Sequence, residues 1–260
     1  MAVNTDAIAA RLAFAKHIAL EAGAVLRKTY YGDMEIRYKG AVDPVTNADL
    51  ESERLVTTAI AREFPGDVVI AEEEHRKVGD PDEFWLIDPL DGTVNFSHRI
   101  PWFAVSIAFV SRHEPLAGVV YNPALGRCYT AMKGRGAWLN GRRLAVSTRD
   151  TLRGCLLATG FPYHRAETGA NFQEHERALR AVQDVRRMGS ASLDICMVAE
   201  GLFDAYYEFG LGPWDFAAGW VIAREAGAAC LDPRGNPPVI GGDSFLCAVP
   251  VLADQVVATI

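Results

Sequence analysis

Residues 84–93 read Phe-Trp-Leu-Ile-Asp-Pro-Leu-Asp-Gly-Thr. The first four residues are apolar, with β-branched and aromatic members, and predict a short strand. The proline that follows stiffens the chain, so the side chains of Asp88 and Asp91 are displayed at a fixed separation. Gly92 permits an unusual backbone angle and the close approach of a ligand. The stretch therefore predicts a strand that leads directly into a ligand-binding loop.

This loop combines features that attract an anion with features that repel it. Thr93 and the amides after it can present N–H groups to an anion at the start of a helix. The carboxylates of Asp88 and Asp91 would repel the same anion unless cations lie between them. Carboxylates are hard oxygen ligands that select Mg²⁺ or Mn²⁺. Two such ions could polarise a phosphoryl group, generate hydroxide from bound water and neutralise a leaving alkoxide, so the loop predicts metal-assisted phosphomonoester hydrolysis.

Two further acidic segments occur where a fold does not require them. Glu72 follows a predicted strand, and Asp215 lies in the first turn of a predicted helix. Ligands gather in loops beyond strand ends in α/β sheets. Simpler interpretations compete: Glu73 and Glu74 fit a solvated turn, and Asp215 also suits the dipole of its helix.

The first half of the chain predicts two helices followed by strands. Thr46-Asn-Ala-Asp49 has the form of a capping box at the start of the second helix. Short apolar runs separated by turn residues such as Asn140-Gly141 predict an antiparallel meander. We expect helices over about 5–30 and 46–63, and strands over 68–70, 84–87, 103–110, 116–121, 127–132 and 137–139.

The second half returns to mixed elements. We expect strands over 155–159, 204–208 and 245–249, and helices over 171–182, 191–200 and 213–226. Strands flanked by helices in both halves, with a meander between them, predict a layered α/β or α+β sandwich. A boundary near residue 150 would divide the chain into segments 1–150 and 151–260 of one compact unit.

Composition narrows the class of protein. The 260 residues are 50% hydrophobic and 23% charged, as in ordinary globular proteins. No apolar run approaches the ~20 residues that span a bilayer, and the first residues lack a signal-peptide pattern, so we expect no membrane association and a cytoplasmic location. The net charge of −7 argues against a nucleic-acid partner. Five scattered cysteines without a CxxC pair suit a reducing compartment.

Two long segments resemble the signatures of a known family. Residues 85–96, Trp-Leu-Ile-Asp-Pro-Leu-Asp-Gly-Thr-Val-Asn-Phe, resemble the first signature of the inositol monophosphatase family. Residues 213–227, Pro-Trp-Asp-Phe-Ala-Ala-Gly-Trp-Val-Ile-Ala-Arg-Glu-Ala-Gly, resemble the second. Shorter matches lie at 160–163, 187–191 and 204–208, so the resemblance extends from about residue 43 to 227. Ala71 and Ser190 are small departures from the pattern, and segment 164–183 matches no motif of the family.

The resemblance implies an αβαβα sandwich of the inositol monophosphatase and fructose-1,6-bisphosphatase type, a homodimer, Mg²⁺ dependence with Mn²⁺ as a substitute, and inhibition by Li⁺. It assigns two or three Mg²⁺ ions. Glu72, Asp88 and the Leu90 carbonyl would hold the first, and Asp88, Asp91 and Asp215 the second. Glu72 would help with a third, weaker ion.

The resemblance also assigns catalytic and substrate-binding roles. Asp49 and Thr93 would orient and deprotonate the attacking water, with Glu72 in a catalytic role through its metal. The amides of Gly92 and Thr93 would bind phosphate. Substrate contacts would come further from Asp91, Ala191, Glu208 and Asp215.

These features predict hydrolysis of inositol 1-phosphate, or of another small phosphorylated polyol, to the alcohol and phosphate. Histidinol phosphate is the main alternative, because Glu208 could pair with an amino group as readily as with hydroxyls. Fructose 1,6-bisphosphate and a 3′-phosphoadenosine nucleotide are further alternatives. A regulatory protein that keeps this fold is an alternative of another class. Haloacid dehalogenase-type phosphatases have a similar Asp-x-Asp-Gly-Thr loop, but here the two acids are three positions apart.

Overall fold

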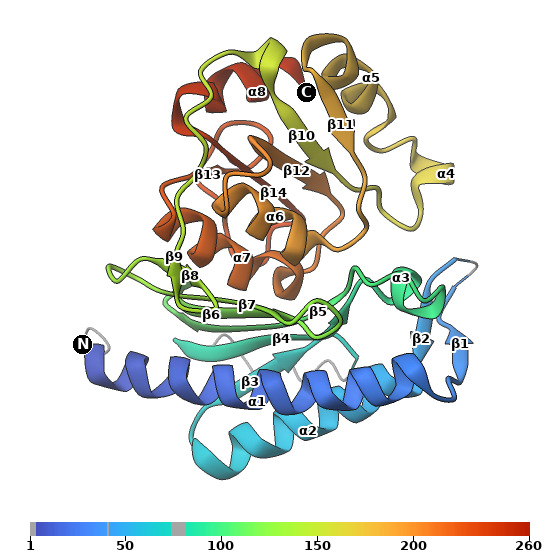
Figure 1. The fold of residues 1–260 in the computed structure, drawn as a ribbon, viewed down its shortest axis with the longest axis vertical. Coiled ribbons are helices and arrows are strands. Elements are labelled where there is room, and N and C mark those ends of the chain that lie inside the picture. Colours follow the sequence, from blue (N-terminus) through green and yellow to red (C-terminus); the bar gives the residue numbers. More distant parts are fainter. Residues whose placement is uncertain (1–3, 41, 74–81) are drawn as a thin grey trace.

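The computed structural model describes residues 4–40, 42–73 and 82–260. Five layers alternate between helices and sheets, from a helix pair at the bottom of Figure 1 to another at the top. From bottom to top, the layers are α1 and α2, a seven-stranded sheet, α6 and α7, a five-stranded sheet, and α5 and α8. This arrangement confirms the predicted layered sandwich.

The outer helix pair covers one face of the larger sheet. Helix α1 (Thr5–Tyr31) buries Ile8, Ala19 and Leu26 on one face. Helix α2 (Asn47–Glu63) begins at the predicted capping box, in which the backbone amide of Thr46 donates to the Asp49 carboxylate at 2.8 Å. The cap therefore fixes Asp49 at the end of α2 that faces the sheet edge.

The seven-stranded sheet has the order β3-β4-β5-β6-β7-β8-β9. Only β3 and β4 are parallel, and the other neighbours form the predicted meander. The strands are β3 (Val68–Ala71), β4 (Glu83–Asp91), β5 (Ala104–Ser111), β6 (Glu114–Asn122), β7 (Arg127–Met132), β8 (Ala137–Leu139) and β9 (Arg142–Arg143).

Strand β4 is longer than predicted. It continues past Ile87 through Pro89 to Asp91, where the sequence suggested a loop. The register with β5 shifts between Asp88 and Asp91, which is the mark of a bulge. A bulge accommodates a proline, which has no amide hydrogen for the ladder. Asp88 and Asp91 are thus held by the sheet itself.

Two further helices lie between the sheets, α6 (Ala191–Ala199) and α7 (Pro213–Glu225). The smaller sheet has the order β11-β10-β12-β14-β13, and α5 (Phe172–Ala181) and α8 (Ala253–Thr259) cover its far face. Its strands are β10 (Leu156–Thr159), β11 (Asp184–Arg186), β12 (Ala205–Phe209), β13 (Ala229–Leu231) and β14 (Ser244–Ala248). One core cluster joins side chains of both sheets through α6 and α7, so the segments before and after residue 150 share it.

The sequence missed several short elements. Strands of three residues are too short to show a period of two, and single helical turns show no amphipathic pattern. The missed elements are β1 (Ile36–Tyr38), β2 (Pro44–Thr46), β9, β11, β13, α3 (Thr93–Ser97) beyond its first residue, α4 (Arg165–Thr168), α8 and the 3₁₀ turns η1 (Leu152–Gly154) and η2 (Pro250–Leu252).

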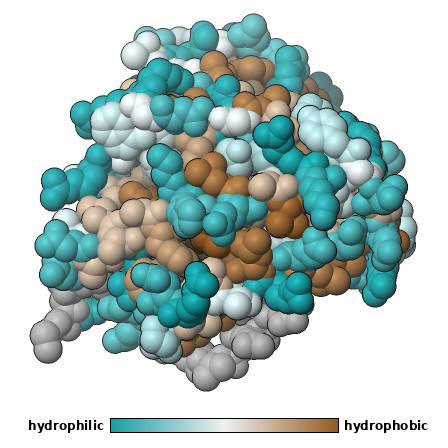
Figure 2. Space-filling model, turned by 60° about the horizontal axis from the view of Figure 1, so that its bottom comes forward, coloured by the Kyte–Doolittle hydropathy of each residue, from teal (hydrophilic) through white to brown (hydrophobic). Residues whose placement is uncertain are grey.

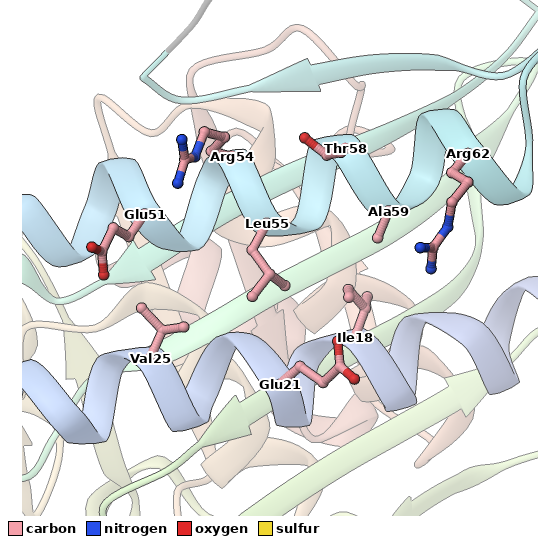
Figure 3. A pocket seen from close by; sticks show the side chains of 9 residues that line it. All are labelled: Ile18, Glu21, Val25, Glu51, Arg54, Leu55, Thr58, Ala59 and Arg62. Carbon is pink, nitrogen blue, oxygen red and sulfur yellow. The ribbon is translucent and has the colours of Figure 1, made fainter.

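The outer face of α1 and α2 carries a groove. Its floor is apolar and includes Ile18, Val25 and Leu55, whereas its rims carry charged side chains such as Glu21 and Arg62 (Figure 3). Seen from that side, hydrophobic residues lie between hydrophilic ones (Figure 2). No helix in the described parts of the chain combines the length and apolarity that a membrane crossing requires.

Candidate active site

A cavity of about 130 Å³, open to solvent, lies where the carboxyl ends of β4 and β12 meet the N-termini of α6 and α7. Five acidic side chains from four segments line it: Glu72, Asp88, Asp91, Glu208 and Asp215. The predicted site residues Leu90, Gly92, Thr93 and Ala191 also line it. The remaining predicted residue, Asp49, lies directly behind Thr93. Segments as far apart as β3 and α7 therefore converge as the sequence predicted.

The acids repel one another. Asp88 and Asp91 are buried, whereas Glu72, Glu208 and Asp215 are partly exposed. Burial raises the pKa of Asp88 well above its usual range, and the charges of Glu72, Asp91 and Asp215 raise it further. Burial likewise raises the pKa of Asp215 well above its usual range, with added repulsion from Glu72 and Asp91. A buried carboxylate needs a cation or a proton to offset its desolvation. The cluster is therefore a place where cations bind favourably.

The donor chemistry fits a hard divalent cation, since Glu72, Asp88, Asp91 and Asp215 offer only carboxylate oxygens and Leu90 adds a carbonyl. In the described residues, no three His, Cys, Asp or Glu side chains are already gathered closely enough to form a ready-made metal cluster. The acids share one cavity, and each also has protein partners.

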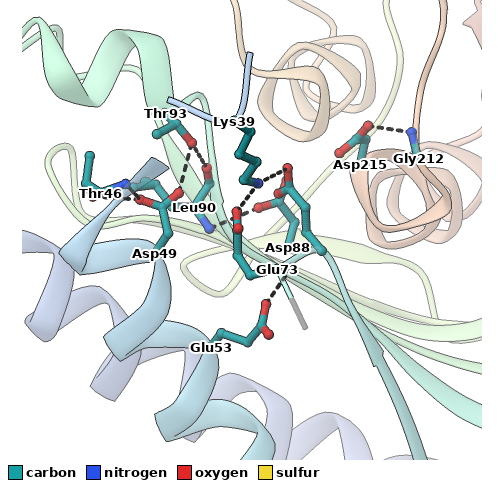
Figure 4. A network of polar contacts seen from close by, with 11 residues as sticks. Lys39, Thr46, Asp49, Glu53, Glu73, Asp88, Leu90, Thr93, Gly212 and Asp215 are labelled. Atoms are coloured by element: carbon teal, nitrogen blue, oxygen red, sulfur yellow. Dashed lines mark hydrogen bonds and ion pairs between the residues drawn. The ribbon is translucent and has the colours of Figure 1, made fainter. Parts of the chain in front are cut away.

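Glu72 and Glu73 meet a lysine that the sequence analysis did not single out. Lys39, in the turn between β1 and β2, lies 2.5 Å from Glu73 and 3.8 Å from Glu72 (Figure 4). Burial raises the pKa of Glu72 to about 8, although Lys39 opposes that rise. The Glu73 side chain is only 7% exposed, and its amide donates to Glu53 at 2.9 Å. The interpretation of Glu73 as part of a solvated turn was therefore wrong, whereas Glu74 lies outside the described residues.

Asp91 connects the larger sheet to α6. Its carboxylate accepts hydrogen bonds from the Ser190 hydroxyl at 2.6 Å, the Ser192 hydroxyl at 2.5 Å, the Ser192 amide at 2.8 Å and the Ala191 amide at 3.2 Å. These amides belong to the first turn of α6, which has no cap from its own N-cap residue. Asp91 thus caps α6 from another layer, a role that local sequence cannot reveal.

Asp215 has the helix-start position that the sequence predicted. The Gly212 amide donates to one carboxylate oxygen of Asp215 at 2.7 Å (Figure 4). This contact caps α7, so the dipole interpretation holds together with the cavity-lining position. One oxygen serves the helix and the other is available to a ligand.

Thr93 and Asp49 form a polar pair beside the acids. The Thr93 hydroxyl lies 3.0 Å from an oxygen of Asp49 and 2.9 Å from the Leu90 carbonyl (Figure 4). Burial raises the pKa of Asp49 to about 6, although hydrogen bonds from Thr46 and Thr93 lower it. A carboxylate of this pKa can receive a proton near neutral pH.

Gly92 turns the chain from β4 into α3. Its φ of 92° is in the left-handed region, and an added Cβ would lie 2.9 Å from the Trp102 carbonyl oxygen. The first amides of α3 have no partners within that helix. The predicted need for glycine is therefore both conformational and steric.

Glu208 lies on the side of the cavity formed by the smaller sheet. The Tyr206 hydroxyl donates to it at 2.6 Å, and burial raises its pKa to about 7. A Cβ at Gly160 would lie 2.1 Å from the Glu208 carboxylate. The motif around Gly160 therefore leaves room for this carboxylate, and the Tyr206 contact was not predicted.

Gly160→Ala is expected to displace Glu208 from the cavity wall, because the new methyl group would occupy the place of its carboxylate. We expect kcat/KM for the preferred substrate to fall about tenfold or more, with a smaller loss of stability. Steady-state kinetics and thermal unfolding would measure the two effects. Gly126→Ala is a control for glycine replacement, since nothing lies within 4 Å of its added Cβ, although its φ of 64° adds backbone strain. Unchanged kinetics for Gly160→Ala would contradict this role.

The stability of protein stripped of divalent ions should fall as pH rises from about 5 to 8. The pKa values of Asp49, Glu208 and Glu72 are raised to about 6, 7 and 8, so the folded chain binds more protons than the unfolded chain in this range. The stabilising protonation is complete below the unfolded pKa values and is lost as pH passes the folded ones. We expect Tm to fall by about 5 °C or more, and Mg²⁺ to restore it most strongly at the alkaline end. A Tm that rises with pH would contradict the raised pKa values.

Comparisons with known proteins agree with this geometry. The profile of the "Inositol monophosphatase family" matches residues 9–260. "Nus factor SuhB" of Salmonella typhimurium is 42% identical over 229 residues, covering 86% of each chain. "Inositol-1-monophosphatase" of Rhizobium meliloti is 40% identical over 217 residues, covering 83% of this chain and 82% of the relative. The solved inositol monophosphatase of Anabaena superposes with a TM-score of 0.89 at 35% identity, covering 97% of this chain and 95% of that one. The chain therefore belongs to the inositol monophosphatase family.

Proposed function

We propose that the protein hydrolyses the phosphomonoester of a small polyol, with inositol 1-phosphate as the leading substrate, by a Mg²⁺-dependent attack of water. The observation that carries this proposal is the convergence of four carboxylates on one cavity, which Thr93 also lines. Asp88 and Asp91, on β4, are buried, whereas Glu72, just after β3, and Asp215, on α7, are partly exposed. Without cations such a cavity would repel a phosphate dianion. The family relationship supports a phosphatase.

The acids Glu72, Asp88, Asp91 and Asp215, with the Leu90 carbonyl, would hold two or three Mg²⁺ ions, with Mn²⁺ as a substitute. Bound there, the ions would polarise the phosphoryl group, lower the pKa of a bound water and neutralise the leaving alkoxide.

The protein would orient the nucleophile through Thr93 and Asp49. The Thr93 hydroxyl has one proton but lies within hydrogen-bond distance of two acceptors, the Asp49 carboxylate and the Leu90 carbonyl. Thr93 can therefore accept a proton from water while its own proton passes to Asp49. The raised pKa of Asp49 suits this transfer near neutral pH.

Substrate recognition would use both sheets. The amides of Gly92 and Thr93, at the start of α3, would bind phosphoryl oxygens. Ala191, at the start of α6, and Glu208 both line the cavity, and Glu208 would accept hydrogen bonds from substrate hydroxyls.

A panel of substrates tests the proposal with purified protein. Phosphate release should be measured from inositol 1-phosphate, histidinol phosphate, fructose 1,6-bisphosphate and a 3′-phosphoadenosine nucleotide, with and without Mg²⁺. We expect the highest kcat/KM for inositol 1-phosphate and no turnover with a chelator. A large preference for histidinol phosphate would replace the leading substrate and keep the reaction class. Inhibition by Li⁺ can be scored in the same assay.

The names of the relatives support a second candidate. Several proteins about 40% identical to this chain are named Nus factor, so a regulatory role through protein contacts is the alternative. Failure to release phosphate from every substrate of the panel in excess Mg²⁺ would favour it. The homodimer implied by the family resemblance is a separate prediction, which light scattering of the purified protein would check.

A further inference from the structure

One basic side chain lines the acidic cavity. Among the described residues around it, Arg187 is the only lysine, arginine or histidine, whereas five are acidic. Arg187 follows β11 and precedes α6, at the end of the cavity that contains Glu208. Its charge lowers the pKa of Glu208 and so partly offsets the effect of burial. At this end of the cavity, away from the acids proposed to bind metal, Glu208 therefore supplies a negative charge and Arg187 a positive one.

The backbone that carries Arg187 is firmly held. The Asn95 side-chain amide donates to the carbonyls of Met188 at 2.9 Å and Gly189 at 3.2 Å. The buried carboxylate of Asp194 accepts from the Met188 backbone and from the Trp102 indole at 3.1 Å. Two buried side chains from different layers thus fix the segment directly after Arg187.

The guanidinium itself is exposed and available. Within the described residues Arg187 makes no hydrogen bond and no ion pair at contact distance, unlike its neighbour Arg186, which lies 2.5 Å from Asp184. The backbone of Gly189, which has a φ of 87°, lies close to the guanidinium of Arg187. A Cβ added at Gly189 would lie 3.3 Å from Nη1 of Arg187. A larger residue at position 189 would crowd the guanidinium.

We infer that Arg187 selects substrates by the charge of the group next to the phosphate ester, favouring an anionic or hydroxyl group and disfavouring an amine. This inference rests on the proposed phosphatase function and refines its substrate class. A guanidinium donates hydrogen bonds and accepts none, and it repels an ammonium group. Glu208 accepts hydrogen bonds, so the pair is complementary to a polyol, whose hydroxyls both donate and accept. An amino alcohol phosphate would satisfy Glu208 but face repulsion from Arg187.

A series of phosphomonoesters of equal size tests the inference. Glycerol 1-phosphate, 3-phosphoglycerate and 3-aminopropane-1,2-diol 1-phosphate place a hydroxyl, a carboxylate and an ammonium group at the same position. We expect kcat/KM to be lowest for the ammonium compound, about tenfold below the other two, which is the effect of one nearby charge at a partly exposed site. In Arg187→Gln the ratio of these kcat/KM values should fall about tenfold, so that the ammonium compound is no longer disfavoured. In Arg187→Glu the ammonium compound should become the preferred substrate.

Matched variants separate local charge from general effects. Arg186→Gln removes an equal charge one residue away, on a side chain that is paired with Asp184, and should leave the order of the three substrates unchanged. Arg187→Lys keeps the charge and should retain most of the discrimination. Circular dichroism and Tm would show that each variant is folded.

The outcomes are distinct for the two proposals. An unchanged ratio of kcat/KM values in Arg187→Gln, or an equal effect of Arg186→Gln, would overturn the role of Arg187 while leaving the phosphatase function intact. Hydrolysis of none of these esters, nor of inositol 1-phosphate, in excess Mg²⁺ would overturn the proposed function and with it this inference.

Discussion

Asp215→Asn is expected to lower kcat at saturating Mg²⁺ by about a thousandfold or more, while the protein remains folded. The substitution removes one negative charge from a buried cluster in which Glu72 and Asp91 already raise the pKa of Asp215. The asparagine carbonyl can still accept the hydrogen bond from the Gly212 amide, so the cap of α7 persists. Loss of the charge should therefore weaken the binding of divalent ions without weakening the helix.

Single-turnover and steady-state rates over a Mg²⁺ titration, together with Tm in a chelator, would measure both effects. We expect Tm in the chelator to be equal to or above that of the wild type, because repulsion is relieved. Asp204→Asn is a control for the loss of a carboxylate outside this cavity. Both oxygens of Asp204 accept hydrogen bonds, from Ser147 and Leu156, so this variant should lose stability but keep its kcat. If Asp215→Asn kept a rate within about tenfold of wild type, the assignment of Asp215 as a ligand would be wrong.

Asp91 differs from Asp215 in the structural part of its role. It accepts four hydrogen bonds from residues 190–192, and an asparagine amide cannot accept at both of its positions. Asp91→Asn should therefore weaken folding more than Asp215→Asn. The structure separates them, because only Asp91 caps a helix of another layer.

Most residues that line the cavity could be singled out from the sequence, because they lie in long continuous segments. Residues 84–93 show strand, proline and glycine signals next to the two aspartates, and the same residues carry the family resemblance. Glu72 and Asp215 could also be singled out, because each is an acid at the end of a predicted strand or the start of a predicted helix. Element type along the long helices and the meander was likewise visible, because their apolar periods are sustained.

The partners of these residues could not be predicted, because they depend on contacts between layers. Lys39 lies in a hairpin whose strands have three residues each, too few for a pattern, yet it pairs with Glu73. Ser190 and Ser192 look like ordinary residues at a helix start until β4 brings Asp91 to them. Arg187 begins the matched segment 187–191, but the sequence assigns it no role, because its significance comes from the acids that surround the cavity.

Thr93 and Asp49 should act as a unit in catalysis. The Thr93 hydroxyl lies 3.0 Å from an oxygen of Asp49, and the proposed proton transfer requires both groups. We expect Thr93→Val and Asp49→Asn each to lower kcat by about 10²–10⁴-fold. The double variant should be no slower than the slower single variant. If the two residues act in one step, removal of either one already abolishes their joint contribution. Additive losses would show that the two residues act independently.

The same pair offers controls that distinguish catalysis from folding. Thr93→Ser retains the hydroxyl and should stay within about tenfold of wild type. The asparagine in Asp49→Asn can still accept from the Thr46 amide, which donates to Asp49 at 2.8 Å, so the start of α2 should stay intact and Tm should change little. Because the pKa of Asp49 is raised to about 6, the wild-type rate should fall as Asp49 is protonated below that pH. The carboxylate would then no longer be able to take the proton that Thr93 passes on, and kcat would report directly on its ionisation.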